Sequence, residues 1–191
     1  MPKQGKIFII SGPSGSGKTT LYRNLLKSRK LQGKIVKAIS VTTRPRREGE
    51  VHGRDYYFVS KEMFRHKKKS GHFLECENVF GNYYGTPKKA VYDHIKGGKS
   101  VILCIDVKGA KTVKRKIDKA VTIFIKTRTL AELKKRLHNR ATETPKKRAL
   151  RLKTAKAELK EATTYDHVVV NDKIPVSLKK LERIILQETK N

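Results

Sequence analysis

A glycine-rich segment of eight residues constrains the fold of this chain more than any other part of the sequence. Residues 12–19 read GPSGSGKT and match the pattern G-x-x-x-x-G-K-[ST] without a mismatch. The apolar run at 6–10 predicts a buried strand before this segment, and the residue spacing after it predicts a helix. Such a loop presents backbone N–H groups and the positive end of a helix to phosphate oxygens. We therefore predict a nucleoside triphosphate site, with Lys18 on the β- and γ-phosphates and the Thr19 hydroxyl on magnesium.

Short apolar strands alternate with helices along much of the chain. Further strands of this kind are predicted at 35–41, 100–106, 121–125 and 168–170. The alternation predicts an α/β fold whose central parallel sheet is covered by helices on both faces. Ligands of such sheets lie beyond the carboxyl ends of the strands, where the phosphate loop, Asp106 and Asn171 are all expected. One shared site is predicted there.

Several charged side chains near this edge suit phosphoryl transfer. Asp106 ends an apolar strand, where the acidic partner of a phosphate loop can orient magnesium or its water ligands. Arg136 and Arg140 share one face of a predicted helix, and Arg151 follows on the next one. Planar guanidinium groups are suited to neutralise charge between two anions. Spacing alone is equally compatible with an exposed, solvated helix face.

The segment at 40–86 has features unlike the rest of the chain. A polar stretch with Pro and Gly at 42–56 precedes a short strand at 57–59, a helix capped by Ser60 and an alternating strand at 72–80. Arginines and phenols could clamp a monophosphate, and a carboxylate is the acceptor that the paired N–H donors of guanine require. Ordinary surface polarity explains the same residues equally well. They are Ser40, Arg44, Arg47, Tyr56, Glu75, Tyr84 and Thr86.

The charge of the chain is unusually positive. Its 191 residues include 46 Lys and Arg against 17 Asp and Glu, a formal net charge of +29. Such a balance favours either nucleic-acid binding or a solvated lysine-rich surface with a few arginines aimed at anionic substrates. The basic triplets are scattered, and the sequence contains no aromatic RNP-type motif and no zinc knuckle. We expect no specific nucleic-acid function, only weak and salt-sensitive adhesion.

The sequence also bears on the compartment. No apolar run approaches the roughly 20 residues that span a bilayer, and no signal-peptide core precedes the first strand. Cys76 and Cys104 form neither a disulfide framework nor a metal-ligand pattern. We expect a cytoplasmic protein with reduced thiols and no membrane partner. The oligomeric state is left open.

Taken together, these motifs resemble the guanylate kinase family over essentially the whole chain. Besides the phosphate loop, the matching segments are TTR at 42–44 with Arg47, GEVHGRDY at 49–56, FLE at 73–75, GNYYGT at 81–86, ID at 105–106 with GA at 109–110, RL at 136–137 with Arg140, Arg151, and VVND at 169–172. The resemblance implies phosphorylation of GMP by MgATP, which gives ADP and GDP.

The resemblance further implies a three-layer fold of the P-loop NTPase type within one domain. Its core comprises about 1–39, 87–126 and 160–191, with a small mixed α+β GMP-binding region at about 40–86 and a helical lid at about 127–159. It assigns the GMP phosphate to Arg44, Arg47, Tyr56 and Tyr84, and the guanine base to Ser40, Glu75 and Thr86. Asp106 would lie beside the substrate and would also hold Mg²⁺ together with Thr19. It assigns ATP and the transferred group to Lys18, Arg136, Arg140 and Arg151, and the remaining ATP contacts to Gly12, Pro13, Ser14, Gly15, Ser16, Gly17, Thr19, Thr20 and Asn171.

Some positions depart from the family pattern. Pro45 comes one place early in the TTR segment, and Arg46 fills the usual position of the proline. Cys104 stands where many members have Asp, which removes one acid near the site. Lys108 replaces a frequent Gln and Ala141 a frequent Gly. Two rival functions are a non-catalytic module of this fold, against which the intact loop argues, and a kinase for another phosphorylated small molecule, which Glu75 disfavours.

Overall fold

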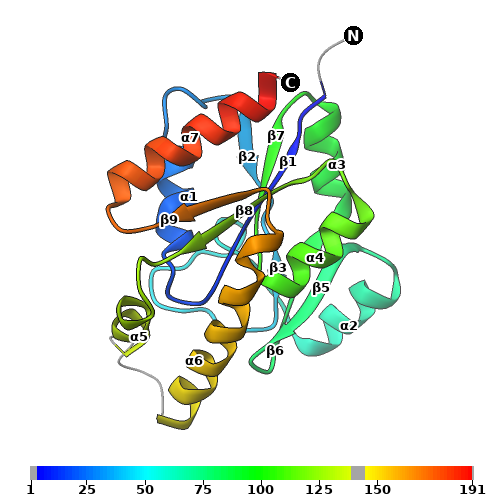
Figure 1. Cartoon of the computed structure of the whole chain (residues 1–191). Helices are drawn as coiled ribbons and strands as arrows, with labels where there is room; N and C mark the ends of the chain where they lie inside the picture. Colours follow the sequence, from blue (N-terminus) through cyan, green and yellow to red (C-terminus); the bar gives the residue numbers. More distant parts are fainter. Residues whose placement is uncertain (1–3, 139–144, 191) are drawn as a thin grey trace.

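The computed structural model describes residues 4–138 and 145–190, with only the backbone for 145–148. A five-stranded parallel sheet forms its centre (Figure 1). The strands run in the order β2-β7-β1-β8-β9, so the chain crosses over between neighbours. Their bounds are β1 (Ile7–Ser11), β2 (Ile35–Lys37), β7 (Ser100–Cys104), β8 (Val121–Lys126) and β9 (His167–Val170).

Helices cover both faces of this sheet, which gives the predicted three layers (Figure 1). Side chains alternate along the buried strand β1, so Phe8 and Ile10 face one layer while Ile7 and Ile9 face the other. The first layer contains α1 (Lys18–Leu26) and α7 (Ile174–Lys190), and the second contains α3 (Lys88–Lys96) and α4 (Val107–Lys116). The predicted α/β fold with a central parallel sheet is confirmed.

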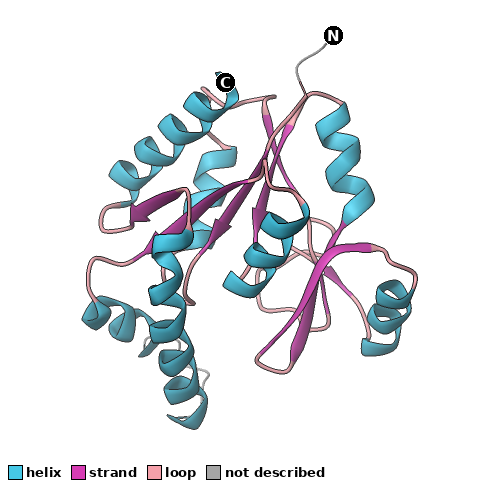
Figure 2. Ribbon diagram, turned by 45° about the vertical axis from the view of Figure 1, so that its right-hand side comes forward, coloured by secondary structure: helices cyan, strands magenta, loops and turns pink. Residues whose placement is uncertain are grey.

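A second, smaller sheet is built from the segment between β2 and α3 (Figure 2). Its order is β4-β3-β6-β5, with parallel pairing of β3 and β4 and antiparallel pairing elsewhere. Phe64 of α2 (Lys61–Lys69) is stacked on Phe73 and Tyr83, with ring centroids 4.7 and 5.4 Å apart, which attaches the helix to the sheet. The strands are β3 (Val41–Thr42), β4 (Tyr57–Phe58), β5 (Phe73–Val79) and β6 (Asn82–Pro87).

The prediction of one strand over 35–41 was wrong. Its first part, β2, pairs with β7 of the central sheet, whereas Val41 and Thr42 pair with β6 of the second sheet. The chain changes sheets between them, and an apolar pattern does not reveal which partner a strand will find. The strand predicted to run to Asp106 ends at Cys104, because Asp106 instead caps α4.

The remaining helices project beyond the sheet edge (Figures 1 and 2). Leu133 and Leu137 of α5 (Leu130–His138) pack against Ala155 of α6 (Pro145–Lys160), and a short 3₁₀ helix, η1 (Glu161–Thr164), follows. The sequence predicted a polar flap over 138–148, but α6 already begins at Pro145, and residues 139–144 lie outside the described residues. Within 4–138 and 145–190, no helix has the length and apolar character needed to cross a membrane.

Candidate active site

The glycine-rich loop connects β1 to α1, as predicted. Gly12, Gly15 and Gly17 have φ angles of 131°, 88° and 90°, a region that side chains rarely adopt. At Gly12 a Cβ atom would lie 2.1 Å from the Ile125 carbonyl oxygen of β8, so only glycine fits. The Lys18 ammonium group donates to the carbonyl oxygens of Gly12 and Pro13, at 2.6 and 2.9 Å. These bonds hold the lysine across the loop.

Asn171 ties the end of β9 to this loop. The side chain is buried, and its Nδ2 atom donates to the Ser16 carbonyl oxygen at 2.8 Å. A Cβ atom on Gly17 would come within 2.2 Å of the same Nδ2 atom, so the contact requires glycine there. Arg136 of α5 donates to the Asn171 carbonyl oxygen at 3.1 Å. One predicted arginine therefore lies beside the loop.

Arg151 of α6 approaches the loop from the other helix. Its NH1 atom donates to the Ser14 hydroxyl at 3.1 Å, and its guanidinium carbon lies 4.6 Å from the centroid of the Phe80 ring. Arg140, the third predicted arginine, lies outside the described residues. The structure thus brings two of the three arginines to the phosphate loop.

Two carboxyl groups meet at the start of α4. Asp106 caps the helix by accepting a hydrogen bond from the Gly109 N–H at 3.1 Å. A Cβ atom built on Gly109 would lie 2.9 Å from Glu75 Oε2 and 3.0 Å from Asp106 Oδ1. Burial raises the pKa of Asp106, although the positive charge of Lys18 opposes this. Burial likewise raises the pKa of Glu75 to about 7, and the Asp106 charge adds to the effect.

A third carboxyl group, which the sequence analysis did not single out, belongs to the same neighbourhood. Burial raises the pKa of Glu158, on α6, to about 7, while the Lys18 charge opposes the rise and the Asp106 charge adds to it. Its position on a mostly polar helix gave no signal in the sequence. Ionisable groups whose pKa values are strongly shifted by burial and by a neighbouring charge are typical of functional sites.

Glu75 is fixed by its neighbour across the second sheet. It is buried in β5, and its register partner Thr86 in β6 donates a hydroxyl hydrogen to Oε1 at 2.6 Å. Ser40, also buried, directly precedes Val41, whose register partner Gly85 adjoins Thr86. Glu75 and Thr86 thus lie on paired strands, and Ser40 directly precedes the strand that pairs with β6 on its other side.

The groups predicted to clamp a monophosphate form a second cluster. Arg44 donates to both carboxylate oxygens of Glu50, at 2.7 and 2.9 Å, and its guanidinium carbon lies 5.6 Å from the centroid of the Tyr56 ring. The rings of Tyr56 and Tyr84 are 6.0 Å apart. Arg47 is exposed and donates its backbone N–H to Glu50 at 2.9 Å. Glu50, for which the sequence assigned no role, therefore orients the Arg44 side chain and bonds the backbone of Arg47.

The ionic state of Glu50 suits this role. Burial alone would raise the pKa of its carboxyl group, but the hydrogen bonds from Arg44 and from the Arg47 N–H lower it below its usual range. Glu50 is therefore a carboxylate at neutral pH. It lies six residues from Arg44 in an irregular loop, where no periodicity could have predicted the pair.

Asp55 anchors the second sheet region to the central core. Its buried carboxylate accepts hydrogen bonds from Arg23 of α1 at 2.5 Å, from Arg54 at 2.9 Å and from the Val51 N–H at 2.9 Å. Lys37 of β2 donates to the Asp55 carbonyl oxygen at 2.7 Å. Burial would raise the pKa of Asp55, but the Val51, Arg54 and Arg23 hydrogen bonds lower it to about 2. The sequence shows no sign of this anchor, because its two partners from the central core, Arg23 and Lys37, are distant along the chain.

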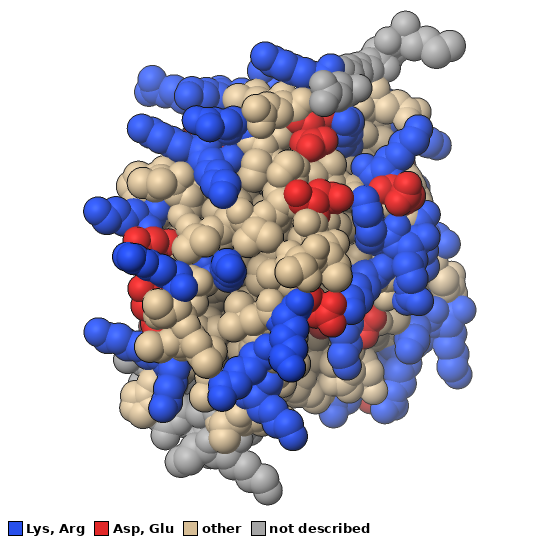
Figure 3. Space-filling model, viewed as in Figure 1, with Lys and Arg blue, Asp and Glu red and all other residues tan. Residues whose placement is uncertain are grey.

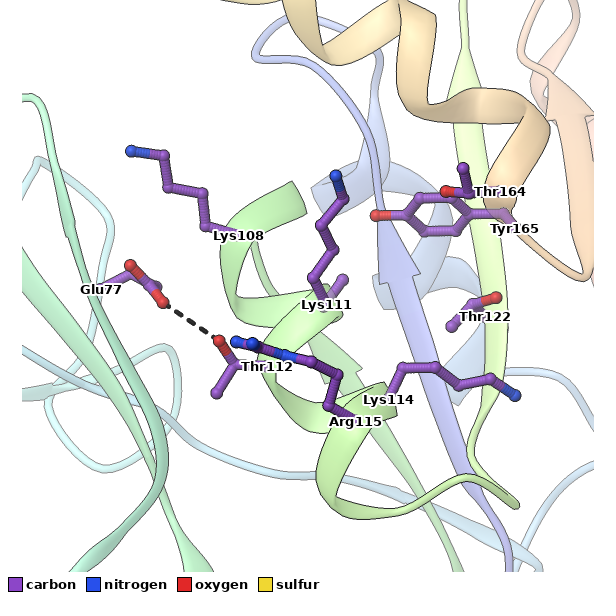
Figure 4. Close-up of a pocket in the computed structure, with 10 residues that line it drawn as sticks. Glu77, Lys108, Lys111, Thr112, Lys114, Arg115, Thr122, Thr164 and Tyr165 are labelled. Carbon is purple, nitrogen blue, oxygen red and sulfur yellow. Dashed lines mark hydrogen bonds between the residues drawn. The ribbon is translucent and has the colours of Figure 1, made fainter.

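A pocket of about 570 Å³ lies beside α4, lined also by Glu77 of β5 and by Thr164 and Tyr165 (Figure 4). Basic side chains of α4 line this pocket. The Thr112 hydroxyl of α4 donates to Glu77 Oε1 of β5 at 3.4 Å. None of the described residues that line it was predicted for the site. The contacts described above instead join the predicted residues to the phosphate loop, to the start of α4 and to the second sheet.

Comparison with known proteins gives a consistent result. Residues 4–188 match the family model described as guanylate kinase. A guanylate kinase from Clostridium tetani is 42% identical over 97% of this chain and 88% of its own length. One from Syntrophomonas wolfei is 44% identical over 98% of this chain and 95% of its own length. A crystal structure of guanylate kinase from Anaplasma phagocytophilum has a TM-score of 0.81 and 34% identity, covering 99% of this chain and 88% of that one.

Proposed function

The chain belongs to the guanylate kinase family, and we infer that it transfers the γ-phosphoryl group of ATP to GMP, giving ADP and GDP. It is thus a nucleoside monophosphate kinase of purine nucleotide metabolism. The observation that carries the choice of acceptor is the buried Glu75 carboxyl group with its Thr86 partner. Guanine offers N1–H and N2–H₂ donors side by side, whereas adenine has no such pair on that edge. The two rival functions, a non-catalytic module and a kinase for another phosphorylated molecule, are not favoured.

For ATP, we propose that the phosphates bind the loop from Gly12 to Thr20. Its positive φ angles and the start of α1 support this proposal, since backbone N–H groups at such a loop and helix start suit phosphate oxygens. Lys18 would exchange its carbonyl contacts for the β- and γ-phosphates. Asn171, bonded to Ser16, supports the base of this loop and would lie near adenine.

For GMP, we propose that the base lies against Ser40, Glu75 and Thr86, with Asp106 beside it. The phosphate of GMP would bind Arg44, Arg47, Tyr56 and Tyr84. The proximity of Arg44 to Tyr56, and of Tyr56 to Tyr84, supports one shared phosphate site. Since Glu50 holds Arg44 through both oxygens, the guanidinium group is oriented before the substrate arrives.

We propose that catalysis rests on positioning and electrostatics. The phosphate of GMP is already an anion, so the attacking oxygen requires no general base. Lys18, Arg136 and Arg151 would neutralise charge that spreads over the transferred group, and Arg140 is proposed to join them. Closure of the 127–159 helices over the 40–86 region would exclude water and prevent hydrolysis of ATP. The remainder, about 1–39, 87–126 and 160–191, would act as the rigid core.

Magnesium is proposed to bind at Thr19 and Asp106. Mg²⁺ keeps several water ligands and takes few protein groups, usually one or two carboxylates beside substrate phosphates. Thr19 is exposed at the start of α1, and the Asp106 Oδ1 atom caps α4, so a hydroxyl and a carboxylate suit the ion. In the described ranges no three His, Cys, Asp or Glu side chains cluster as a metal site of their own. The ion would shield the phosphate charges of ATP.

The basic surface is proposed to have a secondary role. Lys and Arg side chains gather along both sides of the face in Figure 3, around a centre of mostly uncharged residues with few acidic groups. We propose nonspecific, salt-sensitive adhesion to nucleic acid, without base preference. A cytoplasmic location is proposed as well, since ATP and GMP are cytoplasmic metabolites and Cys76 and Cys104 are free thiols.

Calorimetric titration tests the acceptor site directly. GMP should bind the wild-type protein, whereas AMP, which has the same phosphate and a different base edge, should bind far more weakly. Equal affinity for GMP and AMP would contradict the assignment of Glu75 and Thr86 to guanine.

A further inference from the structure

The hairpin between β5 and β6 contains an unusual turn. Val79 and Asn82 are register partners, so Phe80 and Gly81 alone connect the two strands. Their φ angles are 51° and 83°, both positive, as in a type I′ turn. Asn, Asp or Gly is preferred at the first turn position because a bulky side chain clashes with the backbone there. Across 4–138 and 145–190, Phe80 is the one residue other than glycine with a positive φ.

Phenylalanine at the first position of this turn is not the residue that hairpin stability favours. An Asn-Gly turn would connect the same strands without steric strain. The Asn78 side chain accepts a hydrogen bond from the Gly81 N–H at 3.0 Å, so the turn has local support, but this bond does not need an aromatic ring. Residues held in strained backbone conformations tend to cluster at functional sites. Hairpin stability therefore does not explain why a phenyl ring stands at this position.

That explanation lies in the contact with α6. The Arg151 guanidinium carbon is 4.6 Å from the centroid of the Phe80 ring, within the range of a cation–π interaction. The same guanidinium group donates to the Ser14 hydroxyl of the phosphate loop at 3.1 Å. The ring on one side and the hydroxyl on the other thus hold Arg151 between the hairpin tip and the loop.

We propose that Phe80 is a positioning residue for Arg151. By stacking on the guanidinium group, it keeps the arginine aligned with the phosphate loop and links the 40–86 region to α6. The strained turn is retained because it places the ring there. This inference rests on the proposed role of Arg151 in phosphoryl transfer.

The substitution Phe80→Asn separates function from stability. It relieves the turn and removes the ring, so Tm should rise while kcat falls by about tenfold, since a misaligned guanidinium group stabilises the transition state less well. The KM for GMP should stay within about twofold, as the change leaves the Glu75 and Arg44 clusters intact. If Phe80 had only a structural role, Phe80→Asn would instead lower Tm and leave kcat unchanged.

Two further variants make the test specific. Phe80→Tyr keeps the ring and should retain most of the wild-type kcat. In an Arg151→Lys background, where the planar group is already lost, Phe80→Asn should cause little further loss, because the two residues act through one contact. Additive losses in the double variant, or a wild-type kcat in Phe80→Asn, would overturn the proposal.

A readout independent of turnover is the NMR signal of the Arg151 side-chain N–H, identified by its absence in Arg151→Lys. Ring current should displace this signal in the wild type and in Phe80→Tyr, but not in Phe80→Asn. An unchanged signal in Phe80→Asn would also count against the stack. GMP phosphorylation by the wild type is recorded in the same series, so an inactive wild type would contradict the function itself, not the role of Phe80.

Discussion

Thr86 donates its hydroxyl hydrogen to Glu75 Oε1 at 2.6 Å, across the paired strands β6 and β5. The bond fixes the plane of a buried carboxyl group, while Oε2 faces the start of α4 beside Gly109 and Asp106. A side chain held in this way can present acceptor sites to paired N–H donors without first losing rotamer freedom. We propose that this arrangement selects guanine through one carboxylate and one hydroxyl.

The substitution Glu75→Gln tests this arrangement. An amide in place of the carboxylate loses a charged acceptor and turns one donor towards the donors of guanine. Hydrogen bonds to charged groups contribute about 1.5–3 kcal/mol, so kcat/KM for GMP should fall roughly 10- to 100-fold. Steady-state kinetics with GMP varied at saturating MgATP measures the loss.

Glu77→Gln is the matched control for this substitution. Glu77 lies two residues along the same strand, where it accepts a hydrogen bond from Thr112 instead of Thr86. Its kcat/KM for GMP should stay close to the wild-type value. Equal losses in both variants would mean that strand β5 had been disturbed and would remove Glu75 from the guanine site.

The affinity for GMP should depend on pH through Glu75. Burial, together with the negative charges of Asp106 and Glu77, raises the pKa of this carboxyl group to about 7, despite the Thr86 hydrogen bond. Only the ionised form accepts from both guanine donors, so affinity should level off about one pH unit above this pKa. Well below this pKa, affinity should weaken by roughly tenfold for each pH unit. Calorimetric titrations between pH 5.5 and about 8.5 follow this change.

The phosphate of GMP and the Glu158 carboxyl group, whose pKa is also about 7, can titrate in the same range. Both are still present in Glu75→Gln, so the difference between the two pH profiles isolates Glu75. A profile of the variant that parallels the wild type would show that another group controls the pH dependence.

Asp55 should contribute to stability in a pH-dependent way. Its pKa in the folded protein is about 2, against 3.8 normally, so the unfolded state binds more protons between these values. The contribution is therefore complete above about pH 4, and is lost as pH falls towards 2. Asp55→Asn should lower the free energy of unfolding by about 2 kcal/mol at pH 7.

Urea unfolding at several pH values measures this contribution, with Asp93→Asn as the control. Asp93 pairs with Lys89 at 2.7 Å on the exposed face of α3, where an ion pair adds little stability. Asp93→Asn should leave the free energy of unfolding close to the wild-type value at every pH. A difference between wild type and Asp55→Asn that stayed constant down to pH 2.5 would argue against the Asp55 ion pairs as its source.

Gly17→Ala should destabilise the phosphate loop by more than the strain of placing alanine at a positive φ angle. A Cβ atom there would lie 2.2 Å from Asn171 Nδ2, whereas at Gly33, with a similar positive φ, no atom lies within 4 Å. Gly33→Ala should cost about 1–2 kcal/mol of stability and leave ATP binding intact. Gly17→Ala should cost more and weaken ATP binding at least tenfold.

Urea unfolding and titration with a fluorescent ATP analogue compare the two alanine variants. Identical stability and nucleotide affinity in both would mean that the contact between Gly17 and Asn171 is unimportant.

Much of the fold and part of the site could be predicted from the sequence. The phosphate loop is a local pattern with its own geometry, and strands such as β1 are apolar enough to be recognised without partners. The meeting of Asp106 and Asn171 with the loop followed from a general rule for parallel sheets. The assignments of Glu75 and Thr86 depended on family resemblance, and their hydrogen bond across β5 and β6 became visible only in the structure.

What the sequence missed depends on contacts between distant segments. The run at 35–41 divides between two sheets because Val41 finds Gly85 as its partner, a choice that no local pattern encodes. In the sequence, Asp55 is one acid among many polar residues of a loop. Its contacts with Arg23 and Lys37 of the central core are visible only in the structure. The contact of Phe80 with Arg151 was hidden for the same reason, since Arg151 belongs to α6, far along the chain.

The most direct measurement is ADP release from MgATP in a coupled assay, with GMP, AMP, CMP and UMP offered separately at moderate salt. The wild-type protein should release ADP rapidly with GMP and at background rates with the other three. Turnover with GMP would establish both the reaction and the acceptor. Absence of turnover with every acceptor, from protein whose folding has been verified by a cooperative thermal transition, would contradict the assignment of this chain as a GMP kinase.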